Sequence, residues 1–334
     1  MGYWYNNEYG KDNIAISTRV RLARNIVGLP FPSKMNDAQR EELSKKVKNS
    51  INGLGEYKLK FIDMSDVPEN ERYALFERHI ISKEFAENPK DRYLIISDDE
   101  TISIMIGEED HIRIQVIGSG FTPKETYKKA NEIDNELIKN LPIAFDKELG
   151  FLTECPTNLG TGLRVSVMLH LPLLEANKKI PSLVESLNKI GFTIRGMYGE
   201  GTKAISSFYQ ISNQITLGIT EEGAIENLIN ITNQIIELEE NLRKDLQKIY
   251  IEDKSSRALH ILKGAKILET SEMFKLLSDC LIGQNLGVID KDAIAPIKTL
   301  IECGPYMLMS KYGDKTPMER DILRANIVNK SIKL

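Results

Sequence analysis

The amino-acid sequence predicts an α+β protein in which an antiparallel sheet flanked by helices is followed by a small all-helical domain. Two observations carry this prediction. Short runs that alternate apolar and polar residues, as strands with one buried face do, are spread over the chain up to residue 219. After Asp253 such runs stop, and apolar residues recur only at helical spacing. We therefore expect one domain over residues 1–252 and a second over residues 253–334.

The alternating runs are expected to form strands separated by turns or helices. They cover residues 14–22, 92–97, 101–106, 111–117, 163–169, 205–211 and 215–219. The pair 101–106 and 111–117 is predicted to be a hairpin. On its second strand one side carries Ile112, Ile114 and Val116, while the other carries Glu109, His111, Arg113 and Gln115.

Helical spacing and capping residues predict the helices. In the first domain these cover residues 36–51, 68–87, 122–140, 181–190 and 220–248, the last being long enough to act as a spine. In the second domain they cover 254–267, 270–284, 291–303 and 317–331. Thr122 to Glu125 and Thr316 to Glu319 share the pattern Thr-Pro-x-Glu, which predicts a capping box at the start of two of these helices.

Composition narrows the class of protein. A chain of 334 residues that is 41% apolar can bury a sizeable core, and its net charge of −4 gives no global basic field for nucleic acid or an anionic membrane. No secretory leader or membrane-length apolar run is present, so we expect a cytoplasmic protein. Cys155, Cys280 and Cys303 are odd in number and far apart, which argues against a disulfide framework and a structural zinc site.

Arginines recur at polar positions of the predicted strands. One arginine on a sheet face is normally a surface residue or half of an ion pair. Several on different strands of one sheet favour a bound polyanion, because guanidinium groups bind phosphate oxygens bidentately and keep their charge. The chain has no Walker loop and no HRD and DFG set of ordinary protein kinases. The arginines concerned are Arg19, Arg21, Arg113, Arg164 and Arg195.

Three further features accompany these arginines. Glu108, Glu109 and Asp110 would by default form a solvated turn, but beside an arginine cluster they could hold Mg²⁺ on a triphosphate and bind a cationic second substrate. The glycine-rich segment 195–202 is either a closing loop or a simple connection between strands. Cys155 taken alone is more typical of an inert thiol than of a reactive one.

Four blocks, occurring in order, resemble the signature segments of the phosphagen (guanidino) kinases, which transfer the γ-phosphoryl group of MgATP to a guanidinium nitrogen. These blocks are STRVRLARN (17–25), GEEDHIRI (107–114), LTECPTNLGTGLRVSV (152–167) and RGMYGEG (195–201). The resemblance implies a phosphagen-kinase-like catalytic domain. The sequence departs from the family pattern at Gly107, where Asn is usual, and at Val165, where Ala is usual.

The resemblance also implies roles for individual residues. Glu109 is implied to be the main base, Glu200 its partner across the guanidinium, Cys155 the active-site cysteine, and Glu108 a ligand of Mg²⁺, directly or through water. His79 matches a histidine near the adenine. The residues implied to bind ATP are Ser17, Thr18, Arg19, Val20, Arg21, His79, Arg113, Arg164, Val165, Ser166, Val167, Met168, Arg195, Gly196, Met197, Tyr198, Gly199 and Glu200.

Within the family, the chain resembles the bacterial branch that phosphorylates arginines of proteins. The STRVR block begins at Ser17, so the helical domain that precedes it in kinases of small guanidino substrates is missing. Near the other end, RDILRA resembles a motif that recognises phosphoarginine at an allosteric site, which implies that role for Arg320, Asp321, Arg324 and Ala325. Its plain alternative is an exposed helix face with ordinary arginines.

The function predicted from the sequence is therefore an ATP:protein-L-arginine phosphotransferase. The resemblance implies that it marks proteins for degradation and controls a heat-shock repressor, with a zinc-binding activator protein and an AAA+ protease as partners. We expect a homodimer or larger assembly formed through the C-terminal domain, because its short amphipathic helices are too few to bury their apolar faces unaided. No membrane or direct nucleic-acid partner is expected. The alternatives are a kinase of free arginine and a non-catalytic adaptor that binds phosphoarginine.

Overall fold

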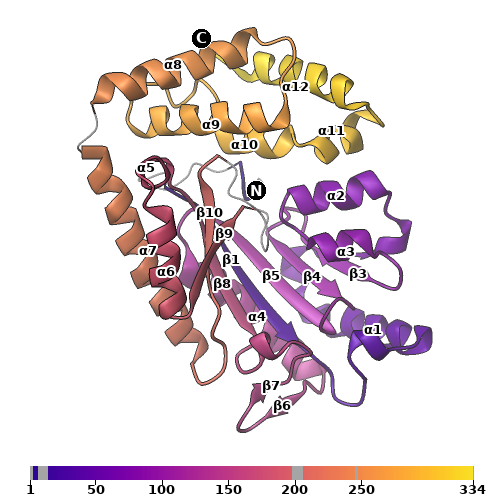
Figure 1. Ribbon diagram of the computed structural model, residues 1–334. Coiled ribbons are helices and arrows are strands. Elements are labelled where there is room, and N and C mark those ends of the chain that lie inside the picture. The colour runs from indigo at the N-terminus through magenta and orange to yellow at the C-terminus, as the bar shows by residue number, and fades with distance from the viewer. Residues whose placement is uncertain (1–2, 7–13, 198–205, 245–246, 334) are drawn as a thin grey trace.

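The computed structural model describes residues 3–6, 14–197, 206–244 and 247–333. An antiparallel sheet with the order β2-β3-β4-β5-β1-β8-β10-β9 runs through its centre (Figure 1). The strands are β1 (Ala15–Arg24), β2 (Lys60–Asp63), β3 (Tyr93–Ile96), β4 (Ile102–Ile106), β5 (Ile112–Ser119), β8 (Leu163–His170), β9 (Phe192–Gly196) and β10 (Phe208–Asn213). A separate short hairpin is formed by β6 (Phe145–Asp146) and β7 (Gly150–Phe151).

Helices surround this sheet. In the first part of the chain they are α1 (Asp37–Ser50), α2 (Glu69–Glu77), α3 (Lys83–Glu87), α4 (Pro123–Asn140), α5 (Pro172–Ala176), α6 (Ile180–Lys189) and α7 (Glu221–Lys244). Short 3-10 turns cover Pro32–Lys34, Asn52–Tyr57, Met64–Asp66 and Pro156–Asn158. The α+β class is confirmed.

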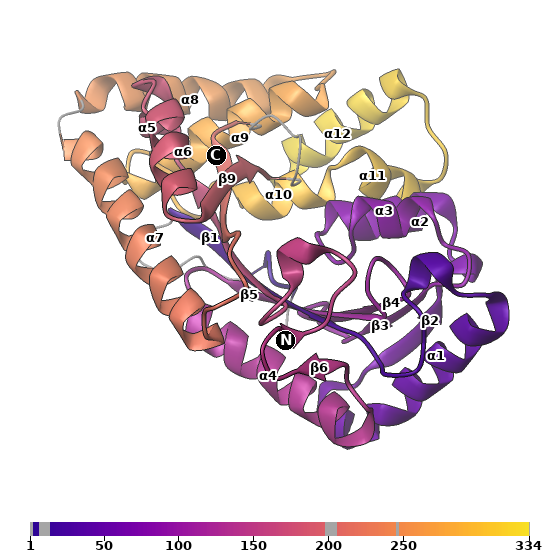
Figure 2. The ribbon, with the colours of Figure 1, turned by 60° about the horizontal axis from the view of Figure 1, so that its bottom comes forward.

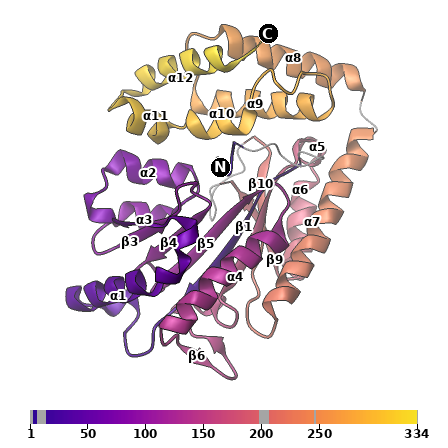
Figure 3. The same cartoon turned by 180° about the vertical axis from the view of Figure 1, so that it is seen from behind.

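The two faces of the sheet are covered differently. On one face α4 and α7 pack over the central strands, and the side chains of Val20, Ile114 and Val165 lie in the main apolar core there (Figure 3). On the other face a smaller apolar cluster that includes Met105 of β4 packs under α2 and α3. On this face α2 and α3 cover only the part of the sheet formed by β3 and β4. The same face of β5, β1, β8, β10 and β9 lines a cavity.

The C-terminal region is all-helical, as predicted, and lies across one end of the sheet (Figure 1). Its helices are α8 (Lys248–Gly264), α9 (Thr270–Asn285), α10 (Pro296–Glu302), α11 (Pro305–Tyr312) and α12 (Pro317–Ser331). Their apolar faces share one core with Ile16, Ile117 and Phe208 from the end of the sheet. The apolar surface that had suggested dimerisation is therefore largely buried within one chain.

α11 binds directly to α2 (Figure 2). The buried carboxylate of Glu77, in the last turn of α2, accepts hydrogen bonds from the backbone N–H groups of Tyr306 (3.1 Å) and Met307 (2.8 Å) in the first turn of α11. Burial raises the pKa of Glu77 to about 7. Tyr73 and Tyr306 stack with their ring centroids 4.5 Å apart. The helical region thus contacts the same helix that leads into the cavity.

Several local predictions are wrong. Residues 215–219 form a turn instead of a strand, because Thr216 bonds to the loop before β8: its hydroxyl donates to the carbonyls of Thr157 (2.9 Å) and Leu159 (2.7 Å). β2 and α11 were not anticipated. The single helix expected over 220–248 ends at Lys244, and the boundary expected near residue 252 falls inside α8.

The two predicted capping boxes differ in outcome. At α12 the box forms: the Thr316 hydroxyl accepts from the Glu319 N–H, and the Glu319 carboxylate accepts from the Thr316 N–H. At α4 the Thr122 side chain makes no cap, because its hydroxyl lies 3.1 Å from that of Thr126 while its N–H donates to Thr18. The same four-residue pattern therefore forms a capping box at only one of the two helices.

Candidate active site

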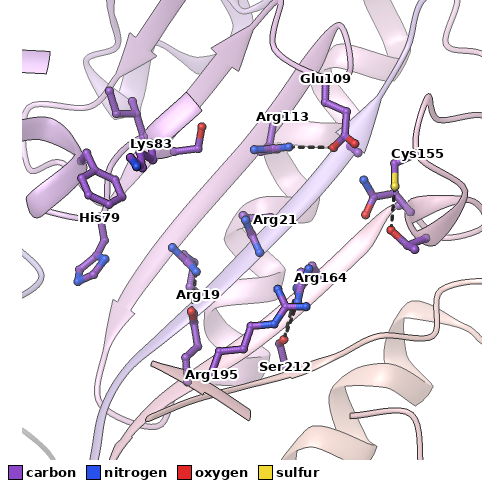
Figure 4. Close-up of a pocket in the computed structure, with 18 of the residues that line it drawn as sticks. Arg19, Arg21, His79, Lys83, Glu109, Arg113, Cys155, Arg164, Arg195 and Ser212 are labelled. Carbon is purple, nitrogen blue, oxygen red and sulfur yellow. Dashed lines mark hydrogen bonds and ion pairs between the residues drawn. The ribbon is translucent and has the colours of Figure 1, made fainter. Parts of the chain in front are cut away.

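Strand alternation gathers the arginines on one face of the sheet. They line one cavity of about 310 Å³, although they come from four strands (Figure 4). The register places Arg21 of β1 directly opposite Arg164 of β8, and Arg195 of β9 opposite Gln210 of β10. All five predicted arginines reach this cavity, as does Lys83 at the start of α3.

The positive charge in this cavity is poorly balanced. Among the described lining residues Glu109 is the one carboxylate against six cations. Burial lowers the pKa of Arg19 to about 10, with Arg164 and Arg113 adding to the effect, and burial also lowers the pKa of Arg21 well below its ordinary value. The buried Nε atoms of Arg19 and Arg21 have no hydrogen-bond partner among the described residues. Like charges facing one another across a sheet destabilise it, so this arrangement fits a bound polyanion such as a nucleotide polyphosphate.

The three acids of the hairpin have three separate environments. Glu109 lines the cavity. Glu108 is buried and paired with Arg113 and with the hydroxyl of Ser82. Asp110 is buried outside the cavity, where it accepts hydrogen bonds from the side chain of Asn25 (2.7 Å) and the N–H of Glu154 (2.9 Å).

His111 does not face the cavity as its polar strand position had suggested. It is buried behind the hairpin, where its Nδ1 accepts from the N–H of Ile26 at 2.9 Å and its Nε2 lies 2.7 Å from the carbonyl of Pro30. Gly107 has φ +80°, a left-handed conformation that glycine and asparagine both tolerate. The replacement of the usual Asn therefore keeps the backbone requirement of this turn.

Glu109 and Cys155 face each other across the open end of the cavity (Figure 4). Burial raises the pKa of Glu109 above its ordinary value, against the opposing effects of Arg113 and of a hydrogen bond with Cys155. The Glu109 carboxylate lies 3.4 Å from Arg113, and the sulfur of Cys155 lies 3.0 Å from the hydroxyl of Thr157. A carboxylate whose proton affinity is raised, placed beside the cation cluster, is suited to accept a proton from a bound cationic group.

His79 lies on the cavity wall, but not within a helix as predicted. The helix expected over 68–87 is divided into α2 and α3, and His79 stands between them with φ +64°. The carbonyls of His79 and Ile80 accept hydrogen bonds from the Gln115 side chain at 2.9 and 2.8 Å, which holds this turn to β5. Burial lowers the pKa of His79 to about 3, so its ring is neutral.

The remaining residues implied to bind ATP fall into four groups. Met197 lines the cavity, and Ser17 and Met168 line a small recess beside it. The side chains of Val20, Val165 and Val167 lie in the core on the opposite face, so these side chains do not reach the cavity. Tyr198, Gly199 and Glu200 lie outside the described residues. Thr18, Ser166 and Gly196 are buried in their strands.

Sequence reasoning missed several lining residues. Gln210 accepts a hydrogen bond from Arg19 at 2.9 Å, and the hydroxyl of Ser212 accepts from Arg164 at 3.2 Å. Both alternate with apolar residues on β10, so the strand pattern could have identified them. Ser82 and Lys83 reach the cavity only because the chain turns after α2, which has no clear local signal.

The plain alternative for the RDILRA segment of α12, an exposed helix face with ordinary arginines, is wrong for two of its residues. Arg324 and Ala325 are buried. The Arg324 guanidinium donates to the carbonyls of Cys303 (2.9 Å) and Leu268 (2.8 Å) and also pairs with Asp321. Arg320 is only partly buried and donates to the carbonyl of Lys315 at 2.9 Å. The expected i,i+4 pair of arginines therefore splits into one buried arginine and one near the surface.

The described residues offer no dedicated metal centre. Within them, no three His, Cys, Asp or Glu side chains are grouped so that they could hold a metal ion, and Glu108 is already engaged by Ser82 and Arg113. Mg²⁺ often keeps several waters and is bound mainly by substrate phosphates. The residues here fit that mode better than they fit a carboxylate cage. No helix in the described part of the chain is both long and apolar enough to cross a membrane.

An antiparallel sheet with a cationic cavity, lined in the described residues by the carboxylate of Glu109, suits phosphoryl transfer, and comparison with known proteins specifies the class of protein. Residues 42–242 match the family model described as ATP:guanido phosphotransferase, C-terminal catalytic domain, and residues 248–334 match that described as Protein-arginine kinase McsB C-terminal domain. The chain belongs to the ATP:guanido phosphotransferase family.

Individual relatives agree with this assignment. A protein named protein-arginine kinase from Clostridium acetobutylicum is 40% identical over 100% of both chains, and one from Clostridium kluyveri is 44% identical over 98% of this chain and 96% of its own. Among solved structures, lombricine kinase matches with a TM-score of 0.62 and 26% identity over 72% of this chain and 71% of its own. The duplicated taurocyamine kinase of Schistosoma mansoni matches with a TM-score of 0.62 and 27% identity over 94% of this chain and 43% of its own.

Proposed function

We propose that this protein transfers the γ-phosphoryl group of ATP to a guanidinium nitrogen of arginine side chains in proteins. The observation that carries the proposal is the cavity itself, in which, among the residues that the structure describes, the carboxylate of Glu109, with a raised pKa, faces six cations. The cations suit the polyphosphate, and the carboxylate suits a cationic acceptor. Protein arginine, in preference to the free amino acid, is supported by the full-length relatives named protein-arginine kinase.

The chemistry required of Glu109 follows from the acceptor. A guanidinium with a pKa above about 12 is not a nucleophile until it loses a proton. Glu109 is placed to orient the group and to accept that proton as the nitrogen bonds to the γ-phosphorus and the bond from phosphorus to the leaving oxygen of ADP breaks. Arg21, Arg113 and Arg164 offset the charge on the transferring group. Magnesium, carried with the nucleotide, supplies further charge neutralisation on the phosphates.

The finer parts of the function rest on the resemblance. We propose that Glu200 pairs with Glu109 around the acceptor guanidinium, and that Arg320 contributes to recognition of phosphoarginine. We also propose that the protein acts in the cytoplasm as a homodimer or larger assembly. Its phosphorylation is proposed to mark proteins for an AAA+ protease and to control a heat-shock repressor, with a zinc-binding protein as activator.

The test is a phosphoryl-transfer assay with MgATP in which one reaction contains free L-arginine and another an arginine-rich unfolded protein. Products are kept out of acid, because N–P bonds hydrolyse there, and the phosphate is located by mass spectrometry. Glu109→Gln, which keeps the shape of the side chain and removes its ability to accept the proton, is the blank. We expect acid-labile phosphate on protein arginines with the wild type and a loss of about 10³-fold with the variant.

Two outcomes would contradict the proposal. Phosphate on free arginine alone would make the protein a kinase of the free amino acid. Binding of phosphoarginine peptides without transfer in either reaction would favour a non-catalytic adaptor.

A further inference from the structure

The turn that carries His79 into the cavity has an unusual backbone. His79 has φ +64°, which costs energy in a residue other than glycine and persists only where the surroundings hold it. Gln115 bonds to two carbonyls of this turn from the sheet side. A second support comes from far away in the sequence, at the N-terminal end of the chain.

That second support is Trp4. Its side chain is 1% exposed, and its indole N–H donates a hydrogen bond of 3.0 Å to the carbonyl of Arg78, the residue that precedes His79. The Trp4 and His79 rings are tilted against each other with centroids 5.9 Å apart. Trp4 therefore contacts both the backbone and the side chain of the turn.

This contact lies at the end of the cavity away from Glu109 and Cys155 (Figure 4). Trp4 and His79 line a narrow recess of about 10 Å³, and Arg19, His79 and Gln210 line both this recess and the main cavity. A void of this size holds at most one water, so the wall behind His79 is packed. Movement of Trp4 would be passed directly to the cavity wall.

The proposed function indicates which part of the substrate this wall meets. The acceptor guanidinium lies at Glu109 and the phosphates lie along the arginines, so the nucleoside extends toward the opposite end. There the lining includes Phe76, His79 and Ile81, which are uncharged at neutral pH, together with the cations Arg19 and Lys83. The aromatic and apolar side chains of this lining suit a purine base.

We propose that Trp4 is a positioning residue of the nucleotide site: its indole fixes the Arg78–His79 turn and thereby sets the affinity for ATP. The role rests on the proposed function. Trp4 also belongs to the apolar core that the C-terminal helices share with the end of the sheet, so one side chain joins that core to the nucleotide wall.

Three measurements test this role. Trp4 is the only tryptophan of the chain, so the tryptophan fluorescence of the wild type reports on this position alone. Titration with MgATP is expected to change the emission saturably, with a midpoint that matches the KM for ATP. An unchanged emission at saturating ATP would overturn the proposal.

The second measurement uses Trp4→Phe, which keeps an aromatic ring and removes the N–H donor. We expect a rise in KM for ATP of roughly two- to tenfold, as loss of one buried hydrogen bond would give, with kcat and the KM for the protein substrate within about twofold. Tyr3→Phe, on the same segment but partly exposed, is the matched control and should leave all three values unchanged.

A double-mutant cycle separates positioning from general packing. If Trp4 acts through the turn, Trp4→Phe should have little further effect on ATP affinity in a His79→Ala background. If the two substitutions weaken ATP binding by fully additive free energies, the proposed role of Trp4 is wrong. Binding of a non-hydrolysable ATP analogue is measured by calorimetry in parallel, so that a weaker affinity of Trp4→Phe supports this inference even if transfer to arginine is not observed.

Discussion

Arg21 and Arg24 lie three residues apart on β1, and they show two different uses of an arginine within a fold. Arg24 points into the core face and is 0% exposed. Its guanidinium bonds to Asp134 at 2.6 to 3.1 Å, to Glu221 at 3.2 Å and to two backbone carbonyls, and it lies over the ring of Phe151. Arg21 points into the cavity, opposite Arg164, and its buried Nε has no hydrogen-bond partner within the described part of the chain.

The difference teaches that burial alone does not reveal the role of an arginine. Arg24 is fully paired by groups of the chain, so its charge helps to hold α4 and α7 against the sheet. Arg21 forms no ion pair with a carboxylate in the described residues, and burial and the cations Arg19, Arg164 and Arg113 lower its pKa against a weaker opposing effect of Glu108. Such an arrangement reduces stability and is understandable only if a ligand completes it. Arg324 resembles Arg24 in this respect, since carbonyls and Asp321 satisfy it.

The largest expected effect follows from Arg21→Met, which removes the charge and keeps most of the length. Phosphoryl transfer is expected to fall by about 10³-fold or more, because this guanidinium offsets charge on the transferring group. The free energy of unfolding should stay the same or rise, because repulsion from Arg19 and Arg164 is relieved. Steady-state kinetics and urea denaturation measure the two quantities. A marked loss of stability with Arg21→Met would break the comparison.

Arg24→Met is the matched substitution on the same strand, and it should have the opposite pattern. It leaves Asp134 buried without its partner, so we expect a loss of about 3–5 kcal/mol in the free energy of unfolding. Activity of the fraction that remains folded should be close to that of the wild type, since Arg24 does not line the cavity. Stability equal to that of the wild type would show that the ion pair with Asp134 is not structural.

The comparison extends to α12 through Arg324→Met. This variant leaves two buried carbonyls and Asp321 without their donor, and we expect a loss of about 2–3 kcal/mol in the free energy of unfolding. Arg320→Ala on the same helix is the control and should change it by less than about 0.5 kcal/mol. If Arg320→Ala weakens binding of a phosphoarginine peptide while stability is unchanged, the proposed recognition role of α12 rests on Arg320. Equal loss of stability in both variants would contradict the distinction drawn here.

The smallest expected effect concerns the pH dependence of phosphoryl transfer, which follows from the pKa of Glu109 in the cavity. Glu109 must be unprotonated to accept a proton, so activity rises as pH rises through its pKa, which burial places above the ordinary carboxyl value. The hydrogen bond from Cys155 lowers the pKa of Glu109 and so opposes the effect of burial. Cys155→Ala should therefore raise the pKa of Glu109 further and move the acid limb of kcat/KM to higher pH.

Cys155→Ser offers the matched rescue, because a hydroxyl can donate the same hydrogen bond. Its acid limb should return toward that of the wild type. An acid limb that stays in place or moves to lower pH in Cys155→Ala would show that the thiol does not stabilise the Glu109 carboxylate.

The amino-acid sequence by itself determined the class of fold, the family and the face of the sheet on which the arginines lie. These depend on local rules: side chains alternate strictly along a strand, so Arg19, Arg21, Arg113 and Arg164 must oppose the apolar core once the strands pair. The order of the four signature blocks was likewise readable without coordinates. The hairpin around Glu109 was predicted for the same reason.

Only the tertiary structure decided which charged groups meet. It placed Glu109 at the cavity, Glu108 against Arg113 and Asp110 in the core, although the three are adjacent in sequence. It divided the helix over 68–87 and held His79 in a left-handed turn through Trp4, 74 residues away from Arg78 in the chain. It also buried Arg324 behind the carbonyls of Cys303 and Leu268. Such contacts are long-range, and local periodicity carries no information about which partner satisfies a buried polar group.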